Sequence, residues 1–487
     1  MNTISPCTLV LFGASGNLSR VKLIPALFRL DEAGKLPPQM AIVSVGRMVM
    51  TRQRWQDEVL TMLSAKFKHG LDTHIVERFI ARQHYHANPP DDLLAFQRLH
   101  DMLADTTTFP PNIAYFLSVR PSDFAPVVES LAGVGLLYEN QCWRRVLIEK
   151  PFGTNLASAQ NLQTRLMHHL HENQIYRIDH YLGKSAVQNI MLTRFTNLAM
   201  QALWHGDHID YVEITNSETL GVGERTTFYD ATGALRDMMQ SHLLQLLALV
   251  AMEQPQNLQP HSIRAEKIKL LKAIHPIPVD HAFRAQYAAG QVLMADGTSE
   301  QVPGYLEELQ RDGITASVTE TYAALKVFID TPRWQGVPFY LRTAKRMHLA
   351  NTEIALHFKP AAMRLSPRQA NNCLVLSIQP HERVQLEVQS KIPGLELATR
   401  NIKLEAAQRQ ASDETIDSYE VLLFDLMLGD NSRYLHIDEV EAQWRLIDPI
   451  VQAWVADRGA VYQYPAGSGD PEASRLIFET NEQFWRR

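Results

Sequence analysis

The segment "TLVLFGASGNLSRVKLIPALFRL", residues 8–30, is the feature that most constrains the fold. Residues 9–12 form a continuous apolar run, which is typical of a strand buried on both faces. Two glycines follow, and apolar residues then recur at helical spacing. A strand, a glycine turn and a helix in this order present backbone N–H groups at a helix N-terminus, where a diphosphate can bind. We expect Asn17 to cap this helix and Pro25 to kink it. The glycine spacing is GxxGxx rather than the full GxGxxG, so a plain tight turn is the alternative.

A second apolar run, "MAIVSVGRM", ends in Gly46-Arg47 rather than in an acidic residue. An acidic residue at this place would hold the ribose 2′-hydroxyl of NAD, whereas an arginine can pair with the 2′-phosphate of NADP. Arg52 and Arg54 follow closely and are candidates to assist. The alternative is a solvated basic loop.

Further strand candidates lie at 112–119 and 144–153, and helical stretches separate all of these strands. Residues 1–178 therefore predict a doubly wound parallel sheet, an α/β Rossmann coenzyme domain. Ligands of such sheets bind outside the carboxyl ends of the strands. Lys150 stands at one such end and can reach both a nicotinamide and a substrate.

The pattern changes after residue 185. Residues 207–218 alternate as a half-buried strand, and later runs resemble antiparallel strands. A long apolar helix is expected over 233–253, and two more helices around 416–429 and 438–456. Residues 179–487 thus predict a second, α+β domain with a large, mainly antiparallel sheet, for substrate binding and dimerisation.

Composition narrows the class of protein. The 487 residues carry a formal net charge of −6, which gives no general attraction to nucleic acid or an anionic membrane. The three cysteines, Cys7, Cys142 and Cys373, support neither a disulfide framework nor a zinc site, and we expect no metal. No signal peptide and no run of 18 apolar residues appears, so we expect a cytoplasmic enzyme or binding protein.

The octet "RIDHYLGK", residues 177–184, concentrates charge, an imidazole and a phenol in eight positions. One interpretation is a solvated turn between a strand and a helix, because charged residues mostly lie on the surface. The other is a site that binds an anion and orients a base.

Seven motifs together resemble the glucose-6-phosphate dehydrogenase family: "GASGNL", "VGR", "IEKPFG", "RIDHYLGK", "RDMMQSHLLQ", "VPGY" and "VPFYLRTAK". The resemblance runs from about residue 8 to residue 465. It implies that glucose 6-phosphate is oxidised at C1 by NADP to 6-phosphogluconolactone, with His242 as the base and Asp179 as the carboxylate that orients it. On spacing alone, a hydrogen-bonded core histidine is the favoured interpretation of His242.

The resemblance also implies roles for the other site residues. The sugar-binding residues would be His180, Tyr181, Lys184, Glu218, Asp237, Lys345 and Lys150, the first three of them at the phosphate. The coenzyme-binding residues would be Gly13, Ser15, Gly16, Asn17, Leu18, Arg47 and Lys150. Asp237 precedes His242 by five residues, about 140° around an α-helix, so we expect the two side chains not to pair. Glu218 could instead be a surface charge.

The chain departs from the family's pattern mostly around the expected sugar pocket. Ala344 stands where the family has a glycine, and Ala350 where it has a basic residue. Residues 223–230 lack the family's paired glycines, and Arg120 stands where the family has a double-proline turn. Two alternatives therefore stay open: a dehydrogenase of a related hexose 6-phosphate such as an amino sugar phosphate, and a non-catalytic relative. We expect a homodimer or homotetramer whose only other partner is the sugar phosphate.

Overall fold

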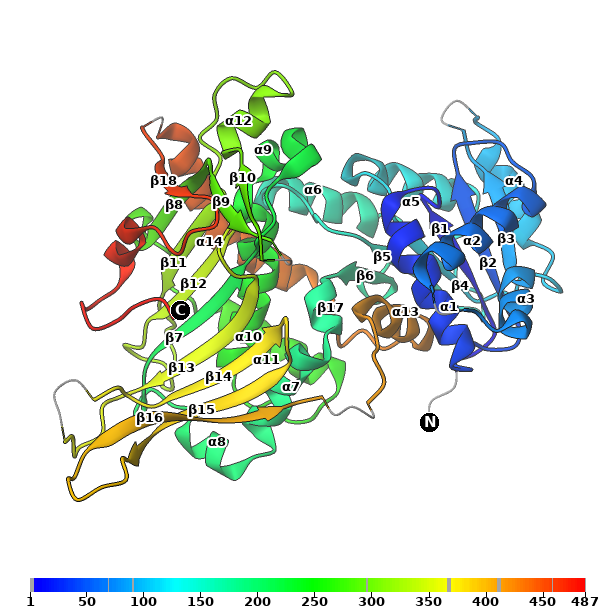
Figure 1. Ribbon diagram of the computed structural model, residues 1–487. Helices are drawn as coiled ribbons and strands as arrows, with labels where there is room; N and C mark the ends of the chain where they lie inside the picture. Colours follow the sequence, from blue (N-terminus) through cyan, green and yellow to red (C-terminus); the bar gives the residue numbers. More distant parts are fainter. Residues whose placement is uncertain are drawn as a thin grey trace. The chain divides into compact units, whose positions relative to one another are not determined.

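The computed structural model describes residues 4–68, 70–89, 92–294, 297–365, 369–409, 413–457 and 459–486. The chain forms two compact units (Figure 1). The first unit comprises Met1–Lys184, Asn257–Arg264 and Thr415–Val440, and the second comprises Ser185–Gln256, Ala265–Glu414 and Glu441–Arg487. The division into domains 1–178 and 179–487 stays a prediction.

The described residues of the first unit form a seven-stranded sheet, in the order β17-β6-β5-β4-β1-β2-β3. All neighbouring strands pair in parallel except β17, which pairs antiparallel to β6. The predicted doubly wound parallel sheet is therefore confirmed. Its strands are β1 (Cys7–Phe12), β2 (Met40–Gly46), β3 (Gln83–Ala87), β4 (Ile113–Leu117), β5 (Arg144–Ile148), β6 (Ile175–Ile178) and β17 (Tyr434–Leu435).

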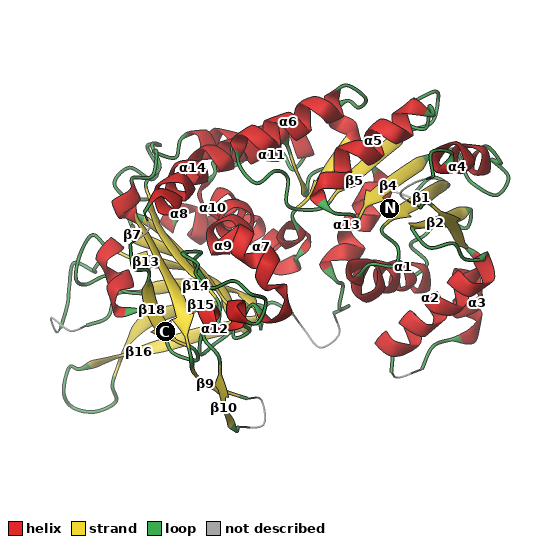
Figure 2. Ribbon diagram, turned by 90° about the horizontal axis from the view of Figure 1, so that it is seen from above, coloured by secondary structure: helices red, strands yellow, loops and turns green. Residues whose placement is uncertain are grey.

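Helices cover both faces of this sheet (Figure 2). Helices α5 and α6 lie on one face, and α1, α2 and α3 lie on the other. Helix α13 packs beside α1, although some 390 residues of chain separate the two. The helices are α1 (Ile24–Glu32), α2 (Arg52–Lys66), α3 (Thr73–Ala81), α4 (Ala95–Leu103), α5 (Phe124–Gly133), α6 (Leu156–Met167) and α13 (Ser418–Leu428).

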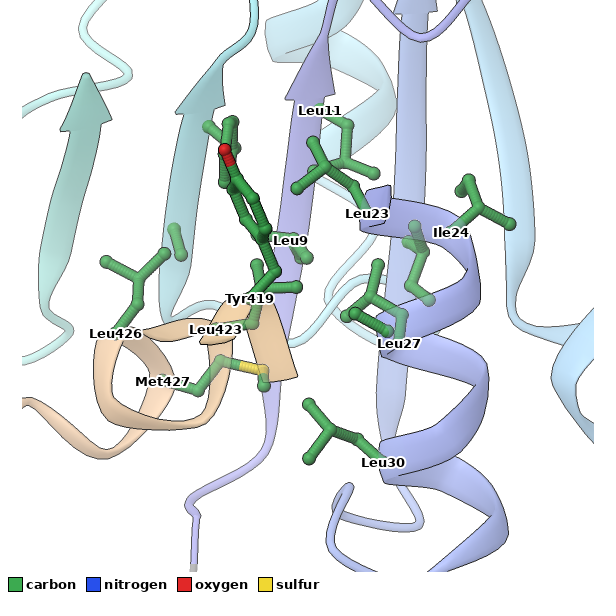
Figure 3. Close-up of a cluster of buried hydrophobic side chains, with 14 of the residues drawn as sticks. Leu9, Leu11, Leu23, Ile24, Leu27, Leu30, Tyr419, Leu423, Leu426 and Met427 are labelled. Carbon is green, nitrogen blue, oxygen red and sulfur yellow. The ribbon is translucent and has the colours of Figure 1, made fainter. Parts of the chain in front are cut away.

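The core of the first unit joins residues from distant parts of the chain. Leu27 and Leu30 of α1 point toward Leu423 and Met427 of α13, beside the strand that carries Leu9 (Figure 3). Leu9, Leu27 and Leu423 are all fully buried. The apolar spacing seen in the sequence thus marks the face of α1 that meets both β1 and α13.

The start of the first helix differs from the expectation. Asn17 does not cap it, because the structure places Asn17 inside a helical turn and a short π-helix, η1 (Ser19–Leu23), follows. No side chain caps η1. Pro25 lies at the start of α1, directly after η1, so the chain is helical on both sides of it and changes from π-helix to α-helix there. The kink at Pro25 stays a prediction.

The described residues of the second unit form a nine-stranded sheet, in the order β16-β15-β14-β13-β7-β12-β11-β8-β18. Most pairs are antiparallel, as predicted, but β7–β12 and β8–β18 are parallel, so the sheet is mixed. Its strands are β7 (Ile209–Ser217), β8 (Ala282–Ala288), β11 (Tyr322–Val327), β12 (Phe339–Ala344), β13 (Asn351–Phe358), β14 (Cys373–Gln379), β15 (Arg383–Lys391), β16 (Thr399–Ala407) and β18 (Tyr462–Pro465). A separate hairpin joins β9 (Gly290–Leu293) and β10 (Ser299–Val302).

The long apolar helix expected over 233–253 is a π-helix, η6 (Leu235–Leu243), that continues directly into α10 (Leu244–Ala251). A kink at Gly233, whose φ is 73°, lies near the end of the preceding helix, α9 (Thr226–Ala234). The other helices of this unit are α7 (Ser185–Phe195), α8 (Leu198–Leu203) and α12 (Tyr305–Gln310). Helices α11 (Pro260–Lys272) and α14 (Ile437–Ala456) contain residues of both units. Among the described residues, no helix is long and apolar enough to cross a membrane.

Candidate active site

A pocket of about 910 Å³ lies at the carboxyl ends of β1, β2, β3 and β4 in the first unit. Six of the predicted coenzyme-binding residues line it: Gly13, Ser15, Gly16, Asn17, Leu18 and Arg47. The pocket lies where a doubly wound sheet is expected to bind its ligand.

The glycine turn is tight because the chain leaves β1 against the end of β4. Gly13 has a φ of 81°, and a Cβ added there would lie 2.0 Å from the carbonyl oxygen of Ser118. Its backbone N–H donates to Val45 at 3.1 Å, and that of Gly16 donates to Gly13 at 2.9 Å. Any side chain at position 13 would push β4 away, so the requirement for glycine is steric. The turn has no side chain at Gly13, lines the pocket and leads into a helix. These features suit the binding of a dinucleotide's diphosphate.

Three arginines follow β2, and the structure separates their roles. Arg47 is exposed, lines the pocket, and makes no side-chain hydrogen bond or ion pair with the described residues. Arg52 is occupied, because its guanidinium donates to the carbonyl oxygens of Gln83 and Ala81 at 2.9 and 2.6 Å. Arg54 lies 3.9 Å from Glu58 on α2 and does not line the pocket. The expectation that Arg52 and Arg54 assist Arg47 is therefore not supported by the geometry.

The octet "RIDHYLGK" divides into a structural residue and a site. Arg177 is almost fully buried in β6, where it forms an ion pair with Glu172 at 2.7 Å and stacks over Phe152 at 4.7 Å. It serves the fold. The octet continues into a short 3-10 helix, η4 (His180–Gly183), which Asp179 caps by accepting a hydrogen bond from the Tyr181 N–H at 3.0 Å.

His180, Tyr181 and Lys184 lie together on and just after η4. The rings of His180 and Tyr181 are 5.2 Å apart, and Lys184 Nζ lies 3.8 Å from the centre of the Tyr181 ring. A Cβ on Gly183 would lie 2.7 Å from the Ser418 carbonyl oxygen, so glycine lets η4 pack closely on α13. One ammonium, one imidazole and one phenol at the carboxyl end of β6 can bind a phosphate dianion.

Two residues beside Lys150 were not predicted from the sequence. Tyr419 of α13 donates a hydrogen bond to Glu149 at 3.1 Å, and its ring lies parallel to that of His180 at 6.4 Å. Burial raises the pKa of Glu149 to about 7, although the Tyr419 hydrogen bond and Lys150 act in the opposite direction. Glu149 belongs to the "IEKPFG" motif, but no sequence signal connects Tyr419 to it, because α13 joins this unit only through tertiary packing.

His242 lies near the end of η6 in the second unit and is completely buried. The expected angle of 140° between Asp237 and His242 is wrong, because it assumed α-helical geometry. Hydrogen bonds of a π-helix link residues five apart, so Asp237 and His242 lie about one turn apart on a similar face.

Glu218 and Lys345 follow the adjacent parallel strands β7 and β12 and form an ion pair. Backbone hydrogen bonds fix both ends, since Glu218 N–H donates to Ala344 and Lys345 N–H donates to Thr321. Glu218 is therefore not an isolated surface charge. The methyl group of Ala344 is buried in the apolar cluster of this unit, while Ala350 is exposed.

Comparison with known families covers nearly the whole chain. The family model described as "Glucose-6-phosphate dehydrogenase, NAD binding domain" matches residues 10–189, and "Glucose-6-phosphate dehydrogenase, C-terminal domain" matches residues 191–486.

Similar proteins agree with these matches. The glucose-6-phosphate 1-dehydrogenase of Treponema pallidum is 40% identical, over 99% of this chain and 95% of that protein. The enzyme of the same name from Gluconobacter oxydans is 40% identical, over 99% and 98%. A solved glucose-6-phosphate dehydrogenase in complex with its substrate is 32% identical, with a TM-score of 0.89 and full coverage of both chains. Another, from Mycobacterium avium, is 30% identical, with a TM-score of 0.85 over 99% of this chain and 98% of that one.

Proposed function

Because this chain belongs to the glucose-6-phosphate dehydrogenase family, we propose that its two units divide the reaction, the first holding NADP and the sugar phosphate and the second supplying the base. The chain is an oxidoreductase of the pentose phosphate pathway that oxidises glucose 6-phosphate with NADP. The product of oxidation at C1 is 6-phosphogluconolactone.

The observation that carries this proposal is the shared edge of the seven-stranded sheet. The glycine turn after β1, Arg47 after β2 and Lys184 after β6 all follow strands that run parallel in that sheet. Carboxyl ends of parallel strands meet at one edge, so the coenzyme pocket and the phosphate-binding residues lie on the same side of the first unit.

In the mechanism, the turn after Gly13 and the helix start that follows it would bind the diphosphate, and Arg47 would bind the 2′-phosphate. Bound NADP supplies the hydride acceptor, which is its nicotinamide. His180, Tyr181 and Lys184 hold the sugar phosphate, and Lys150 orients the sugar near the nicotinamide. Glu218 and Asp237 bind sugar hydroxyls, with Lys345 holding Glu218 in place.

His242 takes the proton from the C1 hydroxyl at its imidazole nitrogen as the hydride leaves, so that no oxyanion accumulates at C1. Imidazole suits this step because its ordinary pKa lies near 6.5. That Asp179 orients this base stays a prediction from the family resemblance.

The test is a comparison of two buried histidines of the second unit. His242→Ala should lower kcat by about 10²–10⁴-fold while NADP binding, measured by titration, is retained. His357 is also buried, but it pairs with Glu213 inside the sheet. His357→Ala should therefore lose thermal stability while its folded fraction keeps near-normal turnover. If His242→Ala showed that second pattern, His242 would be a core residue and not the base.

Glucose 6-phosphate is favoured over another hexose 6-phosphate. The departures at Ala344 and Ala350 carry little weight. The methyl group of Ala344 packs in the core, and Ala350 is exposed. Asp179, Lys184 and His242, which a non-catalytic relative would be expected to lose, are all present. A panel of sugar phosphates, followed by reduced nicotinamide absorbance, checks this. A kcat/KM more than about tenfold higher for another hexose 6-phosphate would replace the assignment.

A homodimer or homotetramer and a cytoplasmic location also stay predictions. Cys7, Cys142 and Cys373 are all free thiols, which is usual in a reducing compartment. Light scattering on the purified chain measures its oligomeric state directly.

A further inference from the structure

The coenzyme pocket has a second guanidinium group in its wall besides that of Arg47. Arg120 follows β4 and lines the same pocket, and its side chain is 78% exposed. Strands β2 and β4 are the two neighbours of β1 in the sheet. Arg47 and Arg120 therefore lie on opposite sides of the glycine turn that follows β1.

Arg120 contacts the carboxylate of Asp123, and this contact leaves part of its guanidinium group able to bind a ligand. Its Nε lies 3.1 Å and its Nη2 lies 3.4 Å from the two carboxylate oxygens of Asp123. Ser122 donates a further hydrogen bond to Asp123 at 3.0 Å, in the turn before α5. A guanidinium has five N–H donors, so a two-point contact with one carboxylate leaves the Nη1 donors for another anion.

The walls of the pocket indicate which end of the dinucleotide lies near Arg120. Leu93 and Phe96 on the α4 side, and Pro126 and Val127 on α5, supply apolar surface to the same pocket. An adenine ring suits such surface, whereas the diphosphate belongs at the glycine turn. The remaining anion of NADP is the 2′-phosphate on the adenosine ribose.

We propose that Arg120 is a second specificity-determining arginine, which binds the adenosine 2′-phosphate of NADP together with Arg47. The inference rests on the proposed function, since it assumes that NADP occupies this pocket. The phosphate dianion is then held by two guanidinium groups from opposite sides. Asp123 offsets part of the charge of Arg120, so the contribution of Arg120 is smaller than that of Arg47.

Direct binding measures this contribution without turnover. Titration of the full chain with NADP, NAD and 2′,5′-ADP gives three dissociation constants for each variant. Arg120→Ala should raise the dissociation constants of NADP and 2′,5′-ADP by about 3- to 20-fold, and that of NAD by less than about 2-fold. Arg120→Lys should recover part of the loss, since it keeps the charge. The salt dependence of NADP binding should also become shallower in Arg120→Ala.

The matched control is Arg165→Ala on α6. Arg165 also makes a two-point contact with one carboxylate, that of Glu129, and it does not line the pocket. Its replacement should leave all three dissociation constants unchanged.

Two results would overturn the inference while the proposed function stands. If Arg120→Ala lost the same affinity for NADP and for NAD, Arg120 would lie at the diphosphate. If NADP binding were unchanged, Arg120 would be a solvated side chain. A wild-type chain that binds no NADP would overturn the proposed function and the inference together.

Discussion

The two large sheets of this protein bury polar groups in opposite ways. In the parallel sheet of the first unit, β1, β2 and β4 are buried throughout and are almost wholly apolar. The polar residues of its pocket begin where the strands end. In the mixed sheet of the second unit, charged residues lie within the strands themselves, among them Glu213 of β7, Arg342 of β12 and His357 of β13. Polar residues that follow β1, β2 and β4 therefore indicate a site, whereas those within β7, β12 and β13 form a structural network.

The buried charges of the second unit are connected to one another and to the last residues of the chain. His357 Nε2 lies 2.6 Å from Glu213, and the His357 ring stacks on Tyr211 with centres 4.0 Å apart. Burial lowers the pKa of His357, but hydrogen bonds with Cys373 and Glu213 outweigh it and raise the pKa to about 10. The backbone N–H of Arg486 also donates to Glu213 at 2.9 Å. This network holds the segment around Arg486 on the sheet.

The largest expected effect comes from breaking this network. Glu213→Ala leaves His357 buried without its carboxylate and should lower the free energy of unfolding by about 3–5 kcal/mol. The folded fraction should keep near-normal kcat, because Glu213 is not among the proposed site residues. Denaturant unfolding and kinetics at a temperature where the variant stays folded measure both quantities. A stable variant with greatly reduced kcat would instead place this network in the active site.

The corresponding substitution in the first unit, Arg47→Ala, should change coenzyme binding but not the stability of the fold. Arg47→Ala should weaken the binding of NADP by about 1.5–3 kcal/mol, which raises its dissociation constant roughly 10- to 150-fold, because the substitution removes a charge-assisted contact. NAD binding and the unfolding midpoint should hardly change, since the Arg47 side chain makes no hydrogen bond or ion pair with the described residues. Titration with both coenzymes checks this. Equal losses for NADP and NAD would show that Arg47 does not bind the 2′-phosphate.

This contrast explains how much the sequence could predict. The run Leu9–Phe12, the glycines after it and Arg47 were found from the residues alone, because an apolar strand followed by a polar loop is a local pattern. The proposed phosphate-binding residues and the proposed base, His242, needed the family resemblance. By themselves, His180 and His242 are polar residues of a kind that the second sheet buries for structural reasons.

What the sequence missed depends on tertiary contacts or on backbone detail. Tyr419 lies 270 residues after its partner Glu149, and no periodicity connects them. The π-helical turns η1 and η6 have the same apolar spacing as α-helices, so Asn17 was assigned as a cap and Asp237 was placed on the wrong face. The parallel pairing of β7 with β12 brings Glu218 to Lys345, although 127 residues separate them.

A smaller effect tests Glu149, a half-buried carboxyl group of the first unit that lies beside Lys150. Because burial raises the pKa of Glu149 to about 7, the folded chain keeps a proton there that the unfolded chain loses near its ordinary pKa of about 4.3. The unfolded state then binds fewer protons, so stability should fall as pH rises from about 4 to 7.

Glu149→Gln stays neutral and should lose this part of the pH dependence. Relative to wild type, it should gain about 1–2 kcal/mol between pH 6 and pH 8. Thermal unfolding of both proteins across this range measures it. Parallel pH curves for the two proteins would mean that Glu149 ionises normally.

The smallest expected effects lie at the surface, where the contrast between the units should disappear. Arg165 and Glu129 of the first unit pair at 2.8 Å with side chains 42% and 40% exposed. Arg383 and Glu405 of the second unit pair at 3.4 Å with side chains 41% and 44% exposed. Water and salt screen both pairs, so Arg165→Ala and Arg383→Ala should each change the free energy of unfolding by less than about 1 kcal/mol. Urea unfolding at low and high salt measures both. If Arg383→Ala lowered the free energy of unfolding nearly as much as Glu213→Ala, an ion pair would stabilise the second sheet whether or not it is buried.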